Sequence, residues 1–399
     1  MKTINDYSII QPDQDMHIHR IGQLCADTFS DGKYVEQYCE NYIGNSNYDW
    51  KTTRVILDGE KMIHHWGVWG YQMRLESVRL KVAGIGAVAT HPDYRKQGLM
   101  HLAAQESFSA MEKDGFDISI LRGRHYVKMG YARAWNYIHY NINPEDIAKH
   151  KLQQPYQRLT VEQIGEVEEL YNQAYSGYSG TAIRPTYLNK HPDDLHMYGW
   201  FDVQGKLVGY IRAMPDEDNP KEFQCVEAVG DPLQGLAVLA ELYQGKDYEK
   251  LTCFTLPYLH PMLQYLRNGA VIVEDRYFDI SGWRVRVINL QRTLTKLIPQ
   301  FEGRLVESRY ATWQGNLLLD AGFQRSMINM DRGRVEITGE GISENVLHGG
   351  ADIARFLIGS DEPDEIIRQA EMECSGLSVA LARVLFPNLH PMMSQWDEF

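Results

Sequence analysis

Apolar and polar residues alternate along the first third of the chain in a pattern that predicts strands and helices in turn. Asp58-Gly59 separates two apolar runs and is typical of a hairpin turn. Over 99–113, apolar residues recur every three or four positions, which predicts a helix with one buried face. In addition, we predict a helix over 19–29 and strands over 52–57, 62–73, 76–90 and 118–121.

The same order of elements returns further along the chain. The pattern predicts a helix over 161–175 and then a strand, a turn and a strand over 200–211. A third region begins near Trp283, with strands predicted over 316–321 and 334–338 and helices over 351–358 and 377–385. We therefore expect a mixed α+β fold in three domains, residues 1–149, 150–285 and 286–399.

The composition narrows the class of protein. With 44% hydrophobic and 23% charged residues, the chain is typical of a soluble globular protein. A net charge of −13 argues against a general affinity for nucleic acid or anionic membranes and is compatible with a cationic substrate. No apolar segment typical of a secretory signal follows Met1–Asp6, and no apolar run is long enough to span a membrane. The five cysteines are scattered along the sequence, so we interpret them as reduced thiols and expect no zinc site. We expect a cytoplasmic protein.

The segment His91–Met100 joins a predicted strand to a predicted helix and carries the clearest chemical signal. The first N–H groups of a helix have no acceptor within it, so they can bind an anion. Arg95 and Lys96 add positive charge, and Gly98 lets the backbone approach a ligand closely. This segment predicts a site for a nucleotide-like cofactor with a diphosphate. The corresponding segment Asp231–Leu236 has no Arg or Lys, so we expect it to be structural.

The segment Val88–Gly98 resembles the acetyl-CoA-binding motif of the GNAT N-acetyltransferase superfamily, although Met100 replaces the usual Gly or Ala. Its Gly-Leu-Met ending resembles the enhanced intracellular survival (Eis) branch. That branch joins two GNAT-like domains, the second degenerate, to a sterol-carrier-protein-like C-terminal domain. The resemblance implies an acetyl-CoA site at Val88, Ala89, Thr90, Arg95, Lys96, Gln97, Gly98, Leu99, Met100, His101, Leu121 and Arg122.

Acetyl transfer from a thioester to an amine requires a base, hydrogen-bond donors for the oxyanion and an acid for the thiolate. His125–Tyr131 resembles the Tyr-x-x-Phe-Gly-Tyr segment of the family, which implies Tyr126 as the acid. The resemblance also implies the α-carboxylate of the last residue, Phe399, as the base, and the candidate oxyanion donor is the Val88 N–H. A carboxylate with a pKa of about 3.5 is a weak base, so burial or a relaying water would have to help.

Other candidate residues have both a functional and a structural interpretation. One of His64 and His65 could face the substrate, but a packed strand is the more common arrangement. Cys25 and Cys39 have no motif that pairs them with a histidine, so we interpret them as buried thiols. Four acidic residues could line a pocket for a cationic substrate or could simply lie on the solvated surface: Asp27, Asp31, Asp397 and Glu398.

These expectations combine into an acetyl-CoA-dependent N-acetyltransferase of the Eis type. Its acceptor would be the primary amine of a cationic small molecule such as an aminoglycoside, attacked directly in a ternary complex. The resemblance implies an oligomer, commonly a hexamer. Two alternatives remain: an acetyltransferase of the same fold that acts on protein lysines or peptides, and a non-catalytic protein that binds acetyl-CoA and a lipid.

Overall fold

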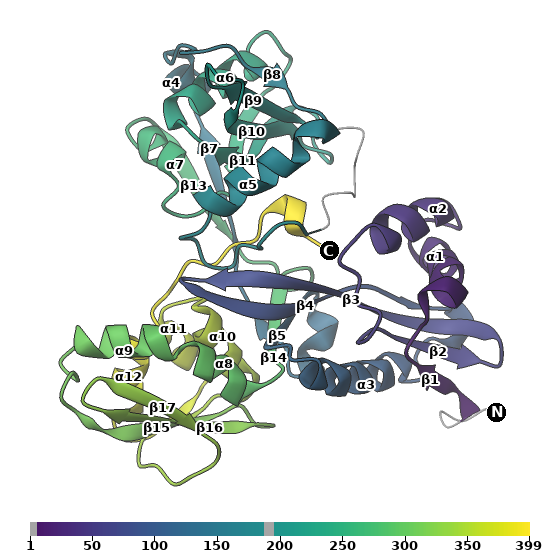
Figure 1. Ribbon diagram of the computed structural model, residues 1–399, viewed down its shortest axis with the longest axis vertical. Coiled ribbons are helices and arrows are strands. Elements are labelled where there is room, and N and C mark those ends of the chain that lie inside the picture. The colour runs from purple at the N-terminus through teal and green to yellow at the C-terminus, as the bar shows by residue number, and fades with distance from the viewer. Residues whose placement is uncertain (1–5, 187–194) are drawn as a thin grey trace. The chain divides into compact units, whose positions relative to one another are not determined.

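The computed structural model describes residues 6–186 and 195–399, so the start of the N-terminal segment discussed above lies outside it (Figure 1). The chain forms two compact units. The first contains the described residues up to Trp135, Asp279–Leu389 and Phe399, and the second contains those of Asn136–Phe278 and His390–Glu398. The mixed α+β fold expected from the sequence is confirmed.

A seven-stranded sheet organises the first unit. Its neighbouring strands are antiparallel except for one parallel pair, β4 and β5, which the helix α3 (Leu99–Lys113) connects. Its strands, in spatial order, are β1 (Ser8–Ile10), β2 (Arg54–Asp58), β3 (Lys61–Leu75), β4 (Val78–Thr90), β5 (Ile118–Arg122), β14 (Trp283–Val287) and β6 (Ala132–Arg133).

Helices cover both faces of this sheet. Successive residues of β2 show this, because Val55 packs in one apolar cluster with α1 (Gln14–Phe29) and Ile56 packs in another with α3. The short helix α2 (Val35–Gln37) and a π-helix (Tyr38–Gly44) follow α1. The helix α1 begins five residues before the predicted start because the Asp13 side chain accepts a hydrogen bond from the Met16 N–H. Its first turn is largely exposed, so it shows no apolar periodicity.

The second unit has its own seven-stranded sheet with one parallel pair, β11 and β12. Its helices are α4 (Pro144–Ala148), α5 (Ile164–Ala174), α6 (Pro232–Tyr243) and α7 (Pro261–Leu266). Its strands, in spatial order, are β13 (Val271–Arg276), β7 (Tyr137–Ile142), β12 (Lys250–Phe254), β11 (Glu222–Val229), β10 (Leu207–Pro215), β9 (Met197–Phe201) and β8 (Gln157–Arg158).

Each of these two sheets includes one strand that is distant in sequence from its neighbours. The strand β14 lies between β5 and β6, and β7 lies between β12 and β13. As a result, the sheets do not follow the expected boundaries near 150 and 286, because β7 precedes the first boundary and β14 spans the second. Pairing between distant strands leaves no local sequence pattern, so apolar periodicity could not reveal it.

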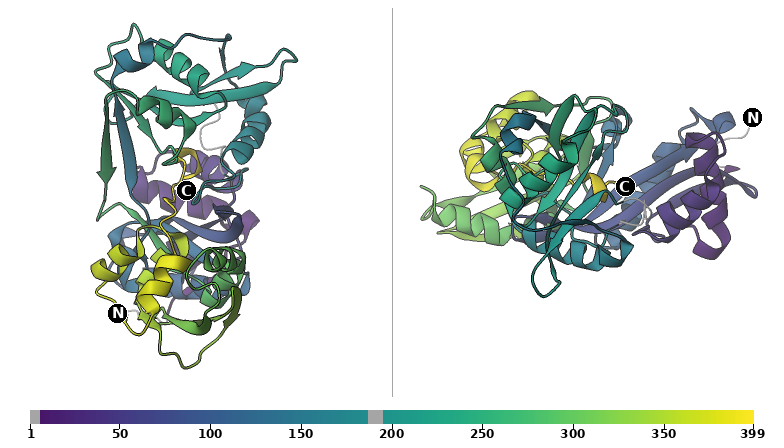
Figure 2. Two further views of the ribbon diagram at one scale, coloured as in Figure 1. Left: turned by 90° about the vertical axis from the view of Figure 1, so that its left-hand side faces the viewer. Right: turned by 90° about the horizontal axis from the view of Figure 1, so that it is seen from above.

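A third, five-stranded sheet belongs to the first unit (Figure 2). The strands of this sheet, in spatial order, are β17 (Arg334–Thr338), β16 (Arg325–Asp331), β15 (Gln314–Asp320), β18 (Val346–His348) and β19 (Glu373–Cys374). The accompanying helices are α8 (Leu290–Lys296), α9 (Ile298–Val306), α10 (Ile353–Ile358), α11 (Pro363–Gln369) and α12 (Ser378–Leu385).

Among the described residues, none of the helices has the length and apolar character needed to cross a membrane.

Candidate functional site

The predicted anion-binding segment lies between the end of β4 and the start of α3. A single 3₁₀ turn, Pro92–Tyr94, follows β4, and the His91 N–H donates to the Ile63 carbonyl oxygen at 2.9 Å. The chain then reaches α3 through two left-handed residues, Lys96 with φ 64° and Gly98 with φ 80°. Only glycine adopts this conformation without strain, which accounts for Gly98 immediately before the helix.

The backbone of this segment presents several unused donors. Among the described residues, no acceptor pairs with the backbone N–H groups of residues 96–100, and Gly98 has no side chain to cap the helix. The side chains of Arg95 and Lys96 are exposed beside them, and Arg95 Nε donates to the Thr90 carbonyl oxygen at 3.2 Å. Unpaired donors, two cations and a helix dipole fit the diphosphate of acetyl-CoA.

The parallel pair β4–β5 separates before either strand ends. Paired positions run from Val82 opposite Ile118 to Gly84 opposite Ile120. Beyond Gly84 the strand β4 continues to Thr90 without pairing to β5, so the edge of β4 that faces β5 is open. A ligand that needs main-chain hydrogen bonds can therefore approach this part of β4.

A β-bulge lies within the same stretch of β4. The register with β3 shifts between His65 and Gly67, so Ala87 and Val88 together oppose Trp66. Ala87 has a positive φ of 46°. A bulge redirects the backbone groups of the residues it contains, and such bulges are common next to active sites. The expected oxyanion donor, the Val88 N–H, belongs to this bulge.

A buried histidine supports the bulge. His65 Nδ1 lies 2.8 Å from the Ala87 carbonyl oxygen, and His65 Nε2 lies 2.7 Å from the Tyr48 hydroxyl oxygen. A carbonyl can only accept, so we assign the proton to Nδ1 and the acceptor role to Nε2. Burial lowers the pKa of His65 to about 4 and that of His64 to about 3. Both histidines are fully buried, as expected for a packed strand.

The side chain of Phe399 packs against β4 next to the bulge. A methyl group placed on Gly84 would lie 2.5 Å from Phe399 Cε1, so the ring can approach only because position 84 is glycine. The ring centroid lies 5.6 Å from that of Trp283 and 5.9 Å from that of Tyr71. Two aromatic rings and the bare backbone of β4 therefore hold this residue.

The carboxyl group of Phe399 lies at the next glycine of the same strand. A methyl group placed on Gly86 would lie 3.4 Å from the carboxyl carbon and 3.0 Å from the Tyr42 hydroxyl oxygen. The indole of Trp69 also lies next to Gly86, because the same methyl group would lie 2.9 Å from its Cζ3. The carboxyl group thus lies close to the bulge and to the open edge of β4.

Tyr126 lies in a 3₁₀ helix, Arg124–Met129, that follows β5. Its ring contacts those of Trp66 and Tyr131 edge-on, at centroid distances of 5.8 Å and 6.3 Å. Burial raises the pKa of Tyr126 to about 12, so the hydroxyl stays protonated at neutral pH, as a general acid requires. Tyr131 is fully buried, and its hydroxyl lies 2.7 Å from Ser119 Oγ, so this tyrosine belongs to the core.

The remaining predicted residues differ in their surroundings. Leu121 is buried at the end of β5, and Arg122 is exposed, with Nε donating to the Ser281 carbonyl oxygen at 3.2 Å. Asp27 is exposed on α1 and accepts a hydrogen bond from Gln23, so it takes no part in the contacts around β4. Glu398 is half-buried and belongs to the second unit.

Three features of the site were absent from the sequence-based prediction. The glycines Gly84 and Gly86, which accommodate Phe399, carry a readable signal, because two glycines inside a strand often mark a close approach of another group. The bulge at Ala87 and the histidine bonded to it follow from strand register, which the sequence does not display.

Cys25 and Cys39 are buried, and the described residues contain no cluster of His, Cys, Asp and Glu that could hold a metal ion.

Comparisons with known proteins find a matching domain family and similar folds. Residues 10–134 match the family described as acetyltransferase (GNAT) domain. No curated protein matches the sequence significantly. Similar solved structures include a GCN5-related N-acetyltransferase from Anabaena variabilis ATCC 29413, which is 18% identical with a TM-score of 0.74 and matches over 97% of this chain and 99% of that one.

Two further structures match over almost the whole chain. One is a conserved protein of unknown function from Enterococcus faecalis V583, described as a probable N-acyltransferase (15% identity, TM-score 0.71, 98% of this chain and 99% of that one). The other is Eis1 from Mycobacterium abscessus (12% identity, TM-score 0.68, 97% and 99%). At these identities the likeness shows a shared fold. The match of residues 10–134 to an acetyltransferase (GNAT) domain supports acetyl transfer as the activity and implies acetyl-CoA as the co-substrate.

Proposed function

We propose that this enzyme is an N-acetyltransferase of the Eis type, in which the α-carboxylate of Phe399 is the general base and Tyr126 is the general acid. The observation that carries the proposal is the position of the Phe399 carboxyl carbon beside Gly86, next to the bulge at Ala87. The anion-binding segment begins at the end of the same strand. Base, oxyanion donor and cofactor contacts would then all be arranged along β4.

In this proposal the acceptor amine loses a proton to the Phe399 carboxylate, directly or through one water. An amine must be deprotonated to attack a carbonyl carbon, and a carboxylate near Tyr42 and Trp69 can take that proton in a partly dehydrated place. The acetyl carbonyl carbon forms a bond to nitrogen and loses its bond to sulfur. The Val88 N–H, in the bulge, would donate to the carbonyl oxygen as negative charge develops there.

Tyr126 would donate its proton to the departing thiolate. Burial raises the pKa of its hydroxyl to about 12, so the hydroxyl remains protonated over the physiological pH range. The residues that would bind acetyl-CoA are those predicted from the sequence: the backbone of 88–90 for the acetyl and pantetheine groups and residues 95–101 for the diphosphate. The unpaired N–H groups of residues 96–100 support the second of these assignments.

The proposed acceptor is the primary amine of a cationic small molecule, with an aminoglycoside as the model compound. Aromatic faces attract cations, and Trp69, Tyr71 and Tyr42 surround the Phe399 carboxyl group and ring. The net charge of −13 favours the approach of a cation. The finer family features remain part of the proposal: a degenerate second GNAT-like domain, a sterol-carrier-protein-like third domain over 286–399, a homo-oligomer such as a hexamer, and a cytoplasmic location.

An amine panel tests the acceptor class. The full-length protein is incubated with acetyl-CoA and, in turn, an aminoglycoside, a polyamine, an arylamine and a lysine peptide, and free thiol is measured as CoA is released. We expect turnover with the aminoglycoside and the polyamine and little with the peptide. A clear preference for the peptide would contradict the proposed acceptor class and favour a protein-lysine acetyltransferase, and binding of acetyl-CoA with no turnover on any amine would favour the non-catalytic alternative.

A further inference from the structure

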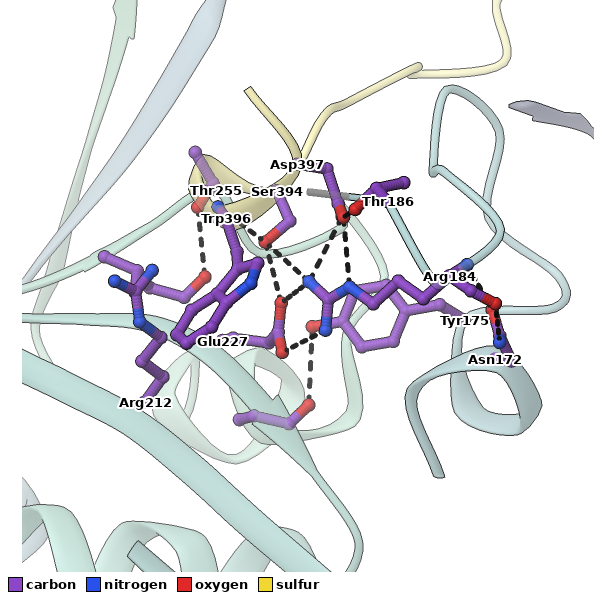
Figure 3. Close-up of polar contacts among 12 residues, drawn as sticks. Asn172, Tyr175, Arg184, Thr186, Arg212, Glu227, Thr255, Ser394, Trp396 and Asp397 are labelled. Carbon is purple, nitrogen blue, oxygen red and sulfur yellow. Dashed lines mark hydrogen bonds and ion pairs between the residues drawn. The ribbon is translucent and has the colours of Figure 1, made fainter. Parts of the chain in front are cut away.

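A buried cluster of charged side chains in the second unit holds the last residues of the chain (Figure 3). The guanidinium of Arg184 forms two parallel hydrogen bonds to Glu227, at 2.8 Å to Oε1 and 2.6 Å to Oε2. It also donates to both carboxylate oxygens of Asp397 at 3.1 Å. None of these three side chains is more than 1% exposed. We name Arg184, Glu227 and Asp397 the tail anchor.

The charges and polar groups of the tail anchor are matched. A second guanidinium, that of Arg212, lies 4.1 Å from the ring centroid of Trp396 and interacts electrostatically with both buried carboxylates. The Tyr210 hydroxyl donates to Glu227 Oε1 at 2.6 Å, and the Thr186 hydroxyl donates to Asp397 Oδ1. Buried charges are costly unless they are paired and hydrogen-bonded, and each partner here is satisfied.

Other contacts within the second unit guide the same segment. Ser394 Oγ donates to Glu227 Oε2 at 2.7 Å, and the Met392 N–H donates to the Ser179 carbonyl oxygen at 3.1 Å. The backbone of Met392 passes so close to Gly180 that a methyl group placed there would lie 2.5 Å from the Met392 nitrogen. These contacts hold residues 392–397 against elements between Ser179 and Glu227.

Apolar packing alone would not fix the register of this segment. Trp396 packs in an apolar cluster of the second unit, and such packing is less directional than a hydrogen-bonded ion pair. The guanidinium of Arg184, in contrast, accepts a carboxylate only in a defined geometry, so it selects one residue, Asp397. Buried ionic groups are best known for this role of fixing register rather than for adding stability.

We propose that the tail anchor positions the carboxylate of Phe399 for catalysis, so that Arg184, Glu227 and Asp397 are positioning residues of the acetyl-transfer reaction. The proposal rests on the proposed function of Phe399 as the base. Asp397 precedes Phe399 by two residues, and two residues of extended chain span at most about 7 Å. Holding Asp397 therefore limits where the terminal carboxylate can lie.

The variant Asp397→Ala tests the proposal directly. The two hydrogen bonds between Arg184 and Glu227 do not involve Asp397, so the central pair of the tail anchor remains. The milder variants Asp397→Asn and Thr186→Val remove only the charge or one hydrogen bond, and they keep the test open if the alanine variant unfolds. The matched control is Asp364→Ala, which removes an aspartate that binds Arg383 through both oxygens at an exposed site.

The first readout does not depend on activity. Carboxypeptidase A removes C-terminal aromatic residues from mobile chain ends, and mass spectrometry of the intact protein detects the loss of Phe399. We expect wild type and Asp364→Ala to resist the protease. We expect Asp397→Ala to lose Phe399 at least about tenfold faster, with Asp397→Asn and Thr186→Val in between. Equal rates in wild type and Asp397→Ala would overturn the proposal, because the tail anchor would then not restrain the chain end.

The second readout links the anchor to catalysis. We expect kcat of Asp397→Ala to fall about 100-fold, as misplacement of a catalytic group by about 1 Å does, while KM for acetyl-CoA stays within about twofold. Partial recovery in Asp397→Asn would support positioning. Faster loss of Phe399 together with a wild-type kcat would overturn the positioning role. If deletion of Phe399 itself leaves kcat unchanged, the proposed function has failed, whereas the protease result still reports on the anchor.

Discussion

The two units open their sheets at equivalent strands and use the opening in different ways. In the first unit β4 pairs with β5 up to Gly84 and then continues alone, and in the second β11 pairs with β12 up to Cys225 and then continues alone. Each long strand carries a register shift just beyond this point, at Ala87 in β4 and at Val226 in β11. The backbone plan is therefore the same.

The side chains that follow the opening make the difference. Two residues after the last paired position, β4 has Gly86, which leaves the backbone bare beside the Phe399 carboxyl group. Two residues after Cys225, the last residue of β11 that pairs with β12, the strand β11 has Glu227, whose side chain occupies this position and binds Arg184. The opening in the first unit accepts the Phe399 carboxyl group, and the opening in the second unit is filled by a buried ion pair.

The helices that follow these strands differ in whether their first N–H groups are capped. Gly98, before α3, leaves the first N–H groups of the helix without an acceptor. Asp231, before α6, accepts from the Gln234 N–H at 2.9 Å with its own carboxylate, and Pro232 has no N–H to offer. A helix start that is already capped by an anion cannot bind a phosphate. The same plan thus carries the proposed cofactor site in one unit and a capped, structural helix start in the other.

The largest effect should follow from removing the proposed acid. Tyr126 lies four residues after the end of β5, and Tyr258 lies four residues after the end of β12. We expect Tyr126→Phe to lower kcat by about 10²- to 10⁴-fold, the usual contribution of a general acid, and Tyr258→Phe to leave kcat unchanged. Steady-state CoA release measures both. An equal effect of the two variants would remove the distinction between the units.

The next effect should come from closing the open strand of the first unit. In Gly84→Ala the new methyl group would lie 2.5 Å from the Phe399 ring, which can move because it ends the segment. We expect kcat to fall about 100-fold with the fold retained, since the carboxylate shifts with the ring. Gly70→Ala is the control, because its methyl group would meet its nearest atoms at 3.4 Å. Unchanged turnover in Gly84→Ala would contradict the role of Phe399.

A smaller effect separates the two helix starts. Alanine at Gly98 must adopt φ 80°, so the loop will relax and displace the donors of residues 96–100. We expect Gly98→Ala to raise KM for acetyl-CoA about tenfold, in line with the roughly 1–2 kcal/mol cost of a left-handed residue. Asp231→Ala should leave KM unchanged and lower the unfolding free energy by about 1 kcal/mol. Kinetics and urea unfolding distinguish these outcomes, and a raised KM in Asp231→Ala would contradict the assignment.

The smallest effect concerns a feature that both units share. His65 binds the carbonyl oxygen of Ala87 in β4, and His260 binds that of Ala228 in β11 at 2.9 Å. Burial lowers the pKa of each to about 4, below the ordinary value of 6.5, so both are neutral in the folded protein. Their contribution to stability is complete above pH 6.5 and is lost as the pH falls toward 4.

Urea unfolding at pH 7.5 and pH 5 checks this dependence. Each buried neutral histidine should contribute a slope of up to about 1.4 kcal/mol per pH unit below pH 6.5. We expect His65→Gln to be less stable at pH 7.5 but to lose less stability between the two pH values than wild type. An unchanged difference between the two pH values would show that His65 does not titrate in this way.

Much of the fold follows from local patterns in the sequence. The bounds of α3, Leu99–Lys113, and of β17, Arg334–Thr338, coincide with those predicted, because one buried face or one short alternating run defines each. The positions of β7 and β14 could not be predicted. Each pairs with strands distant in sequence, and the free energy of such pairing depends on partners that no local window contains.

The site divides in a similar way. The segment from Arg95 to Met100 could be predicted from charge, glycine and helix phase, since all three act locally. Phe399 was predicted only through a family resemblance, because its neighbours Gly84 and Trp283 are far away in sequence. Arg184 carried no signal at all, because a single arginine in a loop reveals neither its burial nor its two carboxylate partners.

We propose the carboxylate of Phe399 as the catalytic base at the open strand of the first unit. The most direct measurement compares wild type with a chain that ends at Glu398, recording kcat with an aminoglycoside or polyamine and the Kd of acetyl-CoA by calorimetry. We expect kcat to fall about 10²-fold or more and the Kd to stay within about twofold, because the proposed cofactor contacts lie at residues 88–101. Full turnover in the shortened chain would contradict the proposal.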